Sequence, residues 1–160
     1  MRFVVGLGND SKLLAGTRHN VGADVLIHIV QASHLQWATM RDISCYVAVD
    51  ASLQITYLRP KCAMNDSGKP VRKALQHFRA APADCLVVHD DLERVAGKVS
   101  VKSGGGAAGH NGIRSVSQCL GTEHFPRVRV GIGRPADRSQ VASFVLEAFT
   151  PEESQALRTT

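Results

Sequence analysis

Three short apolar runs, each ending in glycines or in polar residues, constrain the fold of this chain more than any other feature. The runs are Phe3-Val4-Val5-Gly6-Leu7-Gly8, Asp84 to His89, and Val128 to Ile132. Short runs rich in β-branched residues and bounded in this way are typical of buried strands in a parallel sheet. Because ligands bind at the carboxyl ends of strands in open α/β sheets, we expect chemistry in the residues that follow these runs.

Other patterns along the chain predict an alternation of strands and helices. Apolar residues at helical spacing follow Asn20, which is a reasonable helix cap. A tight turn at 49–52 predicts an antiparallel hairpin. The sequence therefore predicts an α/β fold, with a mixed twisted β-sheet flanked by helices on both faces. The further expected elements are strands at 45–49, 53–58 and 98–102, helices at 21–30, 71–78, 113–120 and 141–149, and a last helix from Thr150.

Length and composition limit the domain organisation and the kind of partner. A chain of 160 residues with 44% hydrophobic content can bury one core, so we expect a single domain over 1–160. The formal net charge of +5 favours an anionic partner, and nucleic acid is the obvious candidate, although a modest basic excess is common among proteins that bind no RNA.

Nothing in the sequence indicates a membrane span, a signal peptide or a disulfide framework. No apolar run approaches the roughly 20 residues that cross a bilayer. The cytoplasm is therefore the default location, with the mitochondrial matrix as the alternative if a leader has been removed. The four cysteines show no metal-binding spacing and are expected to be reduced thiols: Cys45, Cys62, Cys85 and Cys119.

Polar residues able to do chemistry collect where expected elements begin or end. A histidine oriented by a carboxylate suits general-base activation of water, and His19 with Asp90 would form such a pair. The absence of a G-x-S-x-G motif makes a covalent nucleophile poorly supported. The residues expected to converge on one crevice are Asn9, His19-Asn20, Met64-Asn65, His89-Asp90 and His110-Asn111.

Simpler interpretations of the same residues stay open at this point. His19 suits a surface or capping position, and Asn65 and Asn111 suit helix caps. The acidic turn from His89 to Glu93 suits a hard cation such as magnesium. The glycine-rich segments lack the further residues that dinucleotide and phosphate-cradling motifs require.

Six blocks of residues stand between the expected strands and helices. They are Val5-Gly6-Leu7-Gly8-Asn9, Thr17-Arg18-His19-Asn20-Val21-Gly22, Met64-Asn65-Asp66-Ser67-Gly68-Lys69, Val88-His89-Asp90-Asp91-Leu92, Lys102-Ser103-Gly104-Gly105-Gly106 with Gly109-His110-Asn111-Gly112, and Arg127-Val128-Arg129-Val130-Gly131-Ile132-Gly133-Arg134-Pro135. In order and spacing this set resembles the bacterial-type peptidyl-tRNA hydrolases, from the first strand to about Pro151.

The resemblance implies a monomeric hydrolase that needs no metal, no cofactor and no obligate protein partner. In it His19, supported by Asp90, activates water against the ester bond between a peptide and its tRNA. The resemblance further assigns substrate binding to Asn9, Met64, Asn65 and Asn111, with Leu14 near the 3′ end, and contacts to tRNA phosphates to Lys102, Arg129 and Arg138.

Three departures from the family pattern bear on the implied function. Leu14 stands where relatives carry a tyrosine, which removes a stacking surface for the terminal adenosine. Ser100 replaces a second basic residue beside Lys102. Relatives continue into a further helix, so the C-terminal helix is expected to be truncated. The alternatives are a non-catalytic RNA-binding member of the same fold, similar to a splicing factor, and a metal-dependent phosphoesterase built on His89, Asp90, Asp91 and Glu93.

Overall fold

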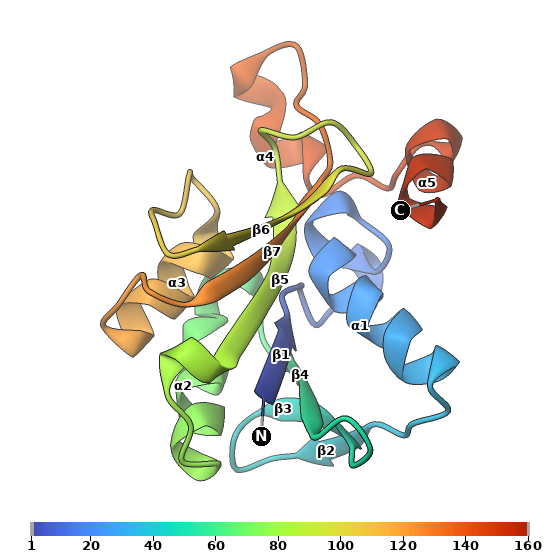
Figure 1. The fold of residues 1–160 in the computed structure, drawn as a ribbon. Coiled ribbons are helices and arrows are strands. Elements are labelled where there is room, and N and C mark those ends of the chain that lie inside the picture. Colours follow the sequence, from blue (N-terminus) through green and yellow to red (C-terminus); the bar gives the residue numbers. More distant parts are fainter. Residues whose placement is uncertain (1, 160) are drawn as a thin grey trace.

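A mixed β-sheet runs through the computed structural model, which describes residues 2–159 (Figure 1). Its strands lie in the order β2-β3-β4-β1-β5-β7-β6. Neighbours β4, β1, β5 and β7 pair in parallel, whereas β2, β3 and β6 pair antiparallel to their neighbours. The strands are β1 (Arg2–Gly6), β2 (Ala38–Met40), β3 (Cys45–Asp50), β4 (Ile55–Pro60), β5 (Cys85–Asp91), β6 (Val99–Ser103) and β7 (Pro126–Gly131).

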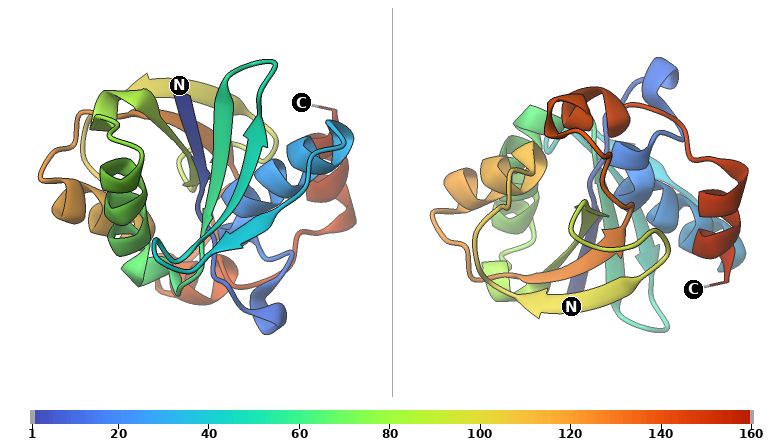
Figure 2. Two further views of the ribbon diagram at one scale, coloured as in Figure 1. Left: turned by 90° about the horizontal axis from the view of Figure 1, so that it is seen from below. Right: turned by 90° about the horizontal axis from the view of Figure 1, so that it is seen from above.

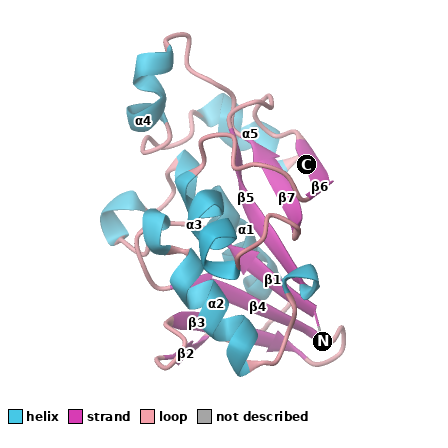
Figure 3. Ribbon diagram, turned by 90° about the vertical axis from the view of Figure 1, so that its left-hand side faces the viewer, coloured by secondary structure: helices cyan, strands magenta, loops and turns pink. Residues whose placement is uncertain are grey.

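Helices cover both faces of this sheet, as predicted. Helices α2 (Gly68–His77) and α3 (Asn111–Leu120) pack together on one face, and α1 (Val21–Ala32) and α5 (Pro151–Arg158) lie on the other (Figure 2). The short helix α4 (Val141–Phe144) lies beyond the end of β5 (Figure 3). Each face encloses its own apolar core, which is the arrangement that a largely parallel sheet requires.

Helix α1 lies unusually close to the sheet because glycines stand at the contact. A Cβ atom on Gly22 would lie 2.2 Å from the carbonyl oxygen of Val88 on β5, and one on Gly6 would lie 2.4 Å from the carbonyl of Gly22. Only residues without a side chain fit at both positions. This close approach places the 3-10 turn Arg18–Asn20, which precedes α1, at the carboxyl edge of the sheet.

Several elements differ from the sequence prediction. Strand β2 was not predicted, and the second hairpin strand is Ile55–Pro60, two residues later than expected, because Asp50 binds the backbone of the turn that follows it. The predicted helix at 141–149 was wrong beyond Phe144. The remainder runs alongside the turn before α1, with Thr17 and Ala148 forming an antiparallel bridge.

The last helix begins as predicted. Thr150 caps α5 through its hydroxyl, which accepts from the Glu153 N–H, while the Glu153 carboxylate accepts from the Thr150 N–H. Among residues 2–159, none of the helices has the length and apolar character to cross a bilayer.

Candidate active site

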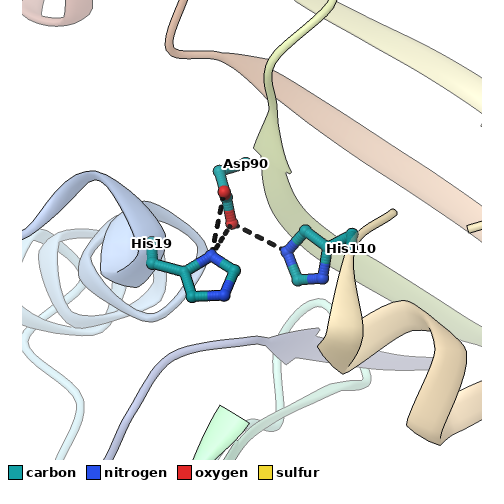
Figure 4. A group of neighbouring side chains, drawn as sticks. All are labelled: His19, Asp90 and His110. Atoms are coloured by element: carbon teal, nitrogen blue, oxygen red, sulfur yellow. Dashed lines mark hydrogen bonds and ion pairs between the residues drawn. The ribbon is translucent and has the colours of Figure 1, made fainter. Parts of the chain in front are cut away.

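Three residues from separate elements meet at the carboxyl edge of the sheet. Asp90, near the end of β5, lies between His19 of the 3-10 turn and His110, the N-cap of α3 (Figure 4). His19 Nδ1 is 2.9 Å from one carboxylate oxygen of Asp90 and 3.0 Å from the other, and His110 Nε2 is 2.8 Å from one of them. The predicted pair of His19 and Asp90 is therefore present, and a second imidazole joins it.

The carboxylate at the centre of this group is ionised although it is buried. Asp90 is only 3% exposed, and burial by itself raises the pKa of its carboxyl group. The interactions with His110 and His19 outweigh burial and hold the pKa well below its ordinary value. An ionised carboxylate is a pure acceptor, so each imidazole turns an N–H toward it.

The hydrogen bonds decide which of the two imidazoles can take up a proton. The backbone N–H of Ile113 donates to His110 Nδ1 at 3.2 Å, so the proton of a neutral His110 ring sits on Nε2, facing Asp90. Both nitrogens of His110 are thus occupied. Within residues 2–159, His19 uses only Nδ1 in this way, which leaves the lone pair of its Nε2 available to accept a proton.

A third imidazole lies behind this group and stays neutral. His89 Nδ1 donates to the backbone carbonyl of Asp90 at 2.7 Å, and its ring packs edge-on against His110 with centroids 5.0 Å apart. Burial and the neighbouring His110 lower the pKa of His89 to about 4. The His89 ring therefore packs against His110 as a neutral group and adds no positive charge to the site.

The same three side chains also carry metal-ligating atoms. The ligand atoms of His19, Asp90 and His110 lie within 4.8 Å of one another. A metal on His110 Nε2 would require the ring proton on Nδ1, where the Ile113 N–H already donates, so the backbone opposes this coordination.

The acidic turn proposed as an alternative cation site is engaged with arginines. The Asp91 carboxylate lies 3.5 Å from Arg94 and 3.6 Å from Arg129, and Glu93 pairs with Arg134. These side chains therefore bind cationic side chains of the protein itself, and the structure does not favour the metal-dependent phosphoesterase.

Asn9 is fixed by its neighbours on both sides. The side chain of Asn20 accepts from the Asn9 N–H at 2.8 Å and donates to the Asn9 carbonyl at 3.0 Å. Asn20 occupies the N-cap position of α1, as predicted, but its side chain makes no capping hydrogen bond because its amide binds the backbone of Asn9. Asn9 Oδ1 accepts from the Met64 N–H at 2.8 Å, so within residues 2–159 its Nδ2 group is left as the free donor.

Met64 joins Asn9 to the turn that carries His110. Its side chain is 3% exposed, and its sulfur packs so close to Gly112 that a Cβ there would lie 2.5 Å away. Asn65 and Leu14 are more exposed than Met64 and, like Asn9 and Met64, do not line the cavity described below. Asn111 lines the cavity, and its side chain accepts from Arg114 at 3.3 Å, so it does not cap α3 as the simpler interpretation held.

A cavity of about 380 Å³ connects the histidines with a basic surface. His19 and Asp90 line it, and Val141, Ala142 and Val145 form an apolar part of the wall. The predicted phosphate contacts also line it. The basic residues of the lining are Lys102, Arg127, Arg129 and Arg138.

Arg127 is a structural part of this site that the sequence analysis missed. It is 2% exposed, and its guanidinium donates to the carbonyl oxygens of Gly105 and Gly106. It thereby holds the glycine-rich loop that leads to His110. The only signal in the sequence was an arginine directly before the apolar run Val128 to Ile132, and strand alternation alone does not say on which face of the sheet such a residue lies.

The fold and the site together define an α/β protein in which two imidazoles flank a buried, ionised carboxylate beside a cavity lined by basic side chains. The sequence model of the family described as "Peptidyl-tRNA hydrolase" matches residues 3–160. Peptidyl-tRNA hydrolase of Mycobacterium tuberculosis (strain H37Ra) is 42% identical over 153 residues, covering 94% of this chain and 80% of the relative. The Mycobacterium leprae enzyme is 42% identical over 160 residues, covering 99% and 80%.

Solved structures give the same result. The crystal structure of peptidyl-tRNA hydrolase from Acinetobacter baumannii superposes with a TM-score of 0.93 at 28% identity, covering 99% of this chain and 82% of that one. Its Arg119Gln mutant superposes with a TM-score of 0.94. This chain belongs to the peptidyl-tRNA hydrolase family.

Proposed function

We propose that this enzyme hydrolyses the ester bond between a peptide and its tRNA by direct attack of water, with His19 as the general base. One observation carries the assignment of the base: Asp90 holds the Nδ1 side of the His19 ring, which leaves Nε2 free to accept a proton. Membership of the family supplies the substrate class.

Protons and bonds balance without a cofactor. Water transfers a proton to His19 Nε2 as its oxygen bonds to the ester carbonyl carbon, and the ionised Asp90 stabilises the imidazolium that forms. The C–O bond to the 3′ oxygen of the terminal ribose then breaks, and His19 returns the proton to that oxygen. The products are the N-acylated peptide as a carboxylic acid and free tRNA.

Amide donors would stabilise the charge that develops on the carbonyl oxygen. The Nδ2 group of Asn9 is suited to this role, because its backbone and Oδ1 are already fixed. A preorganised donor of this kind typically contributes about 10²–10³-fold to the rate. We assign Met64 to the apolar wall beside the 3′ end, and Asn65, Asn111 and Leu14 to contacts with the peptide or the terminal adenosine.

The basic side of the cavity is proposed to bind the tRNA backbone. Lys102, Arg129 and Arg138 are its cationic groups, and phosphate contacts give affinity without reading sequence. We further propose a monomer that acts in the cytoplasm without a metal or an obligate partner. The intact pair of His19 and Asp90 speaks against the non-catalytic RNA-binding alternative.

The test is release of a labelled N-acylated amino acid from acyl-tRNA by the purified chain, with and without a chelator. His19→Ala should lower kcat by about 10²–10⁴-fold, while His28→Ala, at an exposed position of α1, should match the native enzyme. Chelator should have no effect. Release that survives in His19→Ala would remove the base assignment, and tRNA binding without any release would favour the non-catalytic alternative.

A further inference from the structure

The residue before the proposed base makes an unusual set of contacts for an arginine. Arg18 is 4% exposed, and its guanidinium pairs with both oxygens of Glu153, at 3.2 Å from Nε and 2.8 Å from Nη2. Nη1 donates to the carbonyl of Phe144 at 3.1 Å, and the guanidinium carbon lies 4.0 Å from the centre of the Phe144 ring. One buried side chain therefore binds both ends of the segment 144–153.

The backbone around Arg18 binds the middle of the same segment. The Arg18 N–H donates to the Glu147 carbonyl at 3.0 Å, and the His19 N–H donates to the Val145 carbonyl at 2.8 Å. With the bridge between Thr17 and Ala148, the turn carrying His19 gains a short antiparallel partner. The position of His19 thus depends on the segment 144–153.

Glu153 links this arrangement to helix α5. Its carboxylate accepts from the Thr150 N–H at 2.7 Å in the helix cap while it binds Arg18. Partial burial raises the pKa of Glu153, but the hydrogen bonds from Arg18 and Thr150 outweigh burial and lower the pKa overall. The carboxylate is ionised at neutral pH, so the pair with Arg18 is charged and bidentate.

The segment also forms part of the wall of the active-site cavity. Val145, whose carbonyl holds the His19 N–H, lines the cavity together with Val141 and Ala142. In Figure 1 the chain passes from α4 above the sheet to α5 beside α1, so the segment crosses next to the turn before α1. A shift of this segment would move the cavity wall and the base together.

We propose that Arg18 is a positioning residue for the reaction: through Glu153 and Phe144 it fixes the segment 144–153, and through that segment it fixes the His19 backbone and ring against Asp90. This inference rests on the proposed role of His19. Arginine is required because a lysine cannot bind two carboxylate oxygens in parallel while its charge stacks on a phenylalanine ring. A displacement of about 1 Å at a catalytic group can lower the rate by about 10²-fold.

The test compares Arg18→Lys, Glu153→Gln and the double variant with Glu152→Gln, an exposed carboxylate on the same helix turn. Arg18→Lys should lower kcat by about tenfold or more, with KM for acyl-tRNA changed less than about twofold, and Glu153→Gln should act in the same direction. Because both changes break one contact, the double variant should be no slower than Arg18→Lys alone. Glu152→Gln should match the native enzyme.

Two further readouts separate positioning from simple loss of fold. All rates are measured at a temperature where circular dichroism shows each variant folded, and the hydrogen-bonded ring N–H of His19 is followed by NMR with ¹⁵N-labelled histidine. We expect that signal to weaken in Arg18→Lys and in Glu153→Gln. Native kcat in both folded variants, or fully additive losses in the double variant, would overturn the proposal. Failure of His19→Ala to lose activity would instead overturn the proposed function.

Discussion

Asn20 holds the backbone of Asn9 by both of its polar groups at once. Its Oδ1 accepts from the Asn9 N–H and its Nδ2 donates to the Asn9 carbonyl, and the residue itself is 5% exposed. Only an amide side chain offers a donor and an acceptor in this geometry. The clamp fixes the backbone from which the proposed oxyanion donor extends.

Asn20→Asp tests the contact between Asn20 and the Asn9 backbone, because aspartate has nearly the same shape as asparagine. The carboxylate keeps the acceptor for the Asn9 N–H, but it places an oxygen against the Asn9 carbonyl where a donor is needed. We expect the free energy of unfolding to fall by about 1–3 kcal/mol and kcat/KM to fall with it, measured by urea titration and by release from acyl-tRNA. The control is Gln36→Glu, which adds the same charge at an exposed position and should change neither the free energy of unfolding nor kcat/KM. An unchanged kcat/KM in Asn20→Asp would show that the contact between Asn20 and Asn9 does not contribute to the reaction.

His89 makes the stability of the protein depend on pH in a defined window. Its pKa is lowered to about 4 in the folded state, against about 6.5 in an unfolded chain. Between these values the unfolded state binds a proton that the folded state does not, so the free energy of unfolding falls as pH decreases, by up to about 1.4 kcal/mol per pH unit.

His89→Asn should remove this contribution. The asparagine amide keeps a donor for the Asp90 carbonyl but does not titrate. The difference in unfolding free energy between the native chain and the variant, followed by denaturant titration from pH 7 to pH 4, should change steadily across the window. The exposed variant His28→Asn serves as the control for histidine removal. Parallel curves for His89→Asn and the native chain would contradict the prediction.

At the scale of elements, the distance between α1 and the sheet decides where the base stands. The backbone of Gly22 rests on the Val88 carbonyl of β5, two residues before Asp90. His19 precedes the same helix, so the close approach brings the imidazole within hydrogen-bond distance of the carboxylate. A helix displaced outward would separate the pair without altering either residue.

Gly22→Ala tests this dependence. The added methyl group would lie 2.2 Å from the Val88 carbonyl, so α1 must move away from β5. We expect the free energy of unfolding to fall by about 1–3 kcal/mol. We also expect kcat to fall by more than the loss of folded protein explains, because His19 moves away from Asp90. Gly106→Ala is the matched control for stability, because a Cβ there meets no atom within 4 Å. A free energy of unfolding in Gly22→Ala equal to that of the native chain would show that α1 and β5 can accommodate a methyl group between them.

At the scale of the whole molecule, positive charge is concentrated beside the site. The chain carries a formal net charge of +5, and basic residues from β6, β7 and the 3-10 turn Arg138–Gln140 line the cavity. Part of this charge is neutralised locally, since Arg129 pairs with Asp91. Arg138 is exposed and forms no salt bridge within residues 2–159, which makes it the clearest probe of phosphate binding.

Arg138→Gln should weaken tRNA binding in a salt-dependent way. Loss of one phosphate contact is expected to reduce the slope of log K against log salt by about 1. The measurement is tRNA binding by fluorescence anisotropy between low and physiological salt, with Arg72→Gln on α2 as the control for a lost surface charge outside the cavity. An equal change in slope for both variants would assign the effect to net charge alone.

The sequence by itself determined the features that depend on local pattern. The apolar runs placed β1, β5 and β7, and the residues after them marked the edge where His19 and Asp90 meet. Local signals also placed the start of α5 at Thr150. These features follow from side-chain periodicity and capping, which act over a few residues.

Only the tertiary structure decided how the site is held. The clamp of Asn20 on Asn9, the Ile113 N–H that fixes the tautomer of His110, and the burial of Arg127 under the glycine-rich loop have no local signature. Arg18 and Glu153 are 135 residues apart in the chain, and their pairing requires that the predicted helix end at Phe144. Each of these interactions satisfies a buried polar group with whatever partner the fold brings near, and no pattern along the chain specifies that partner.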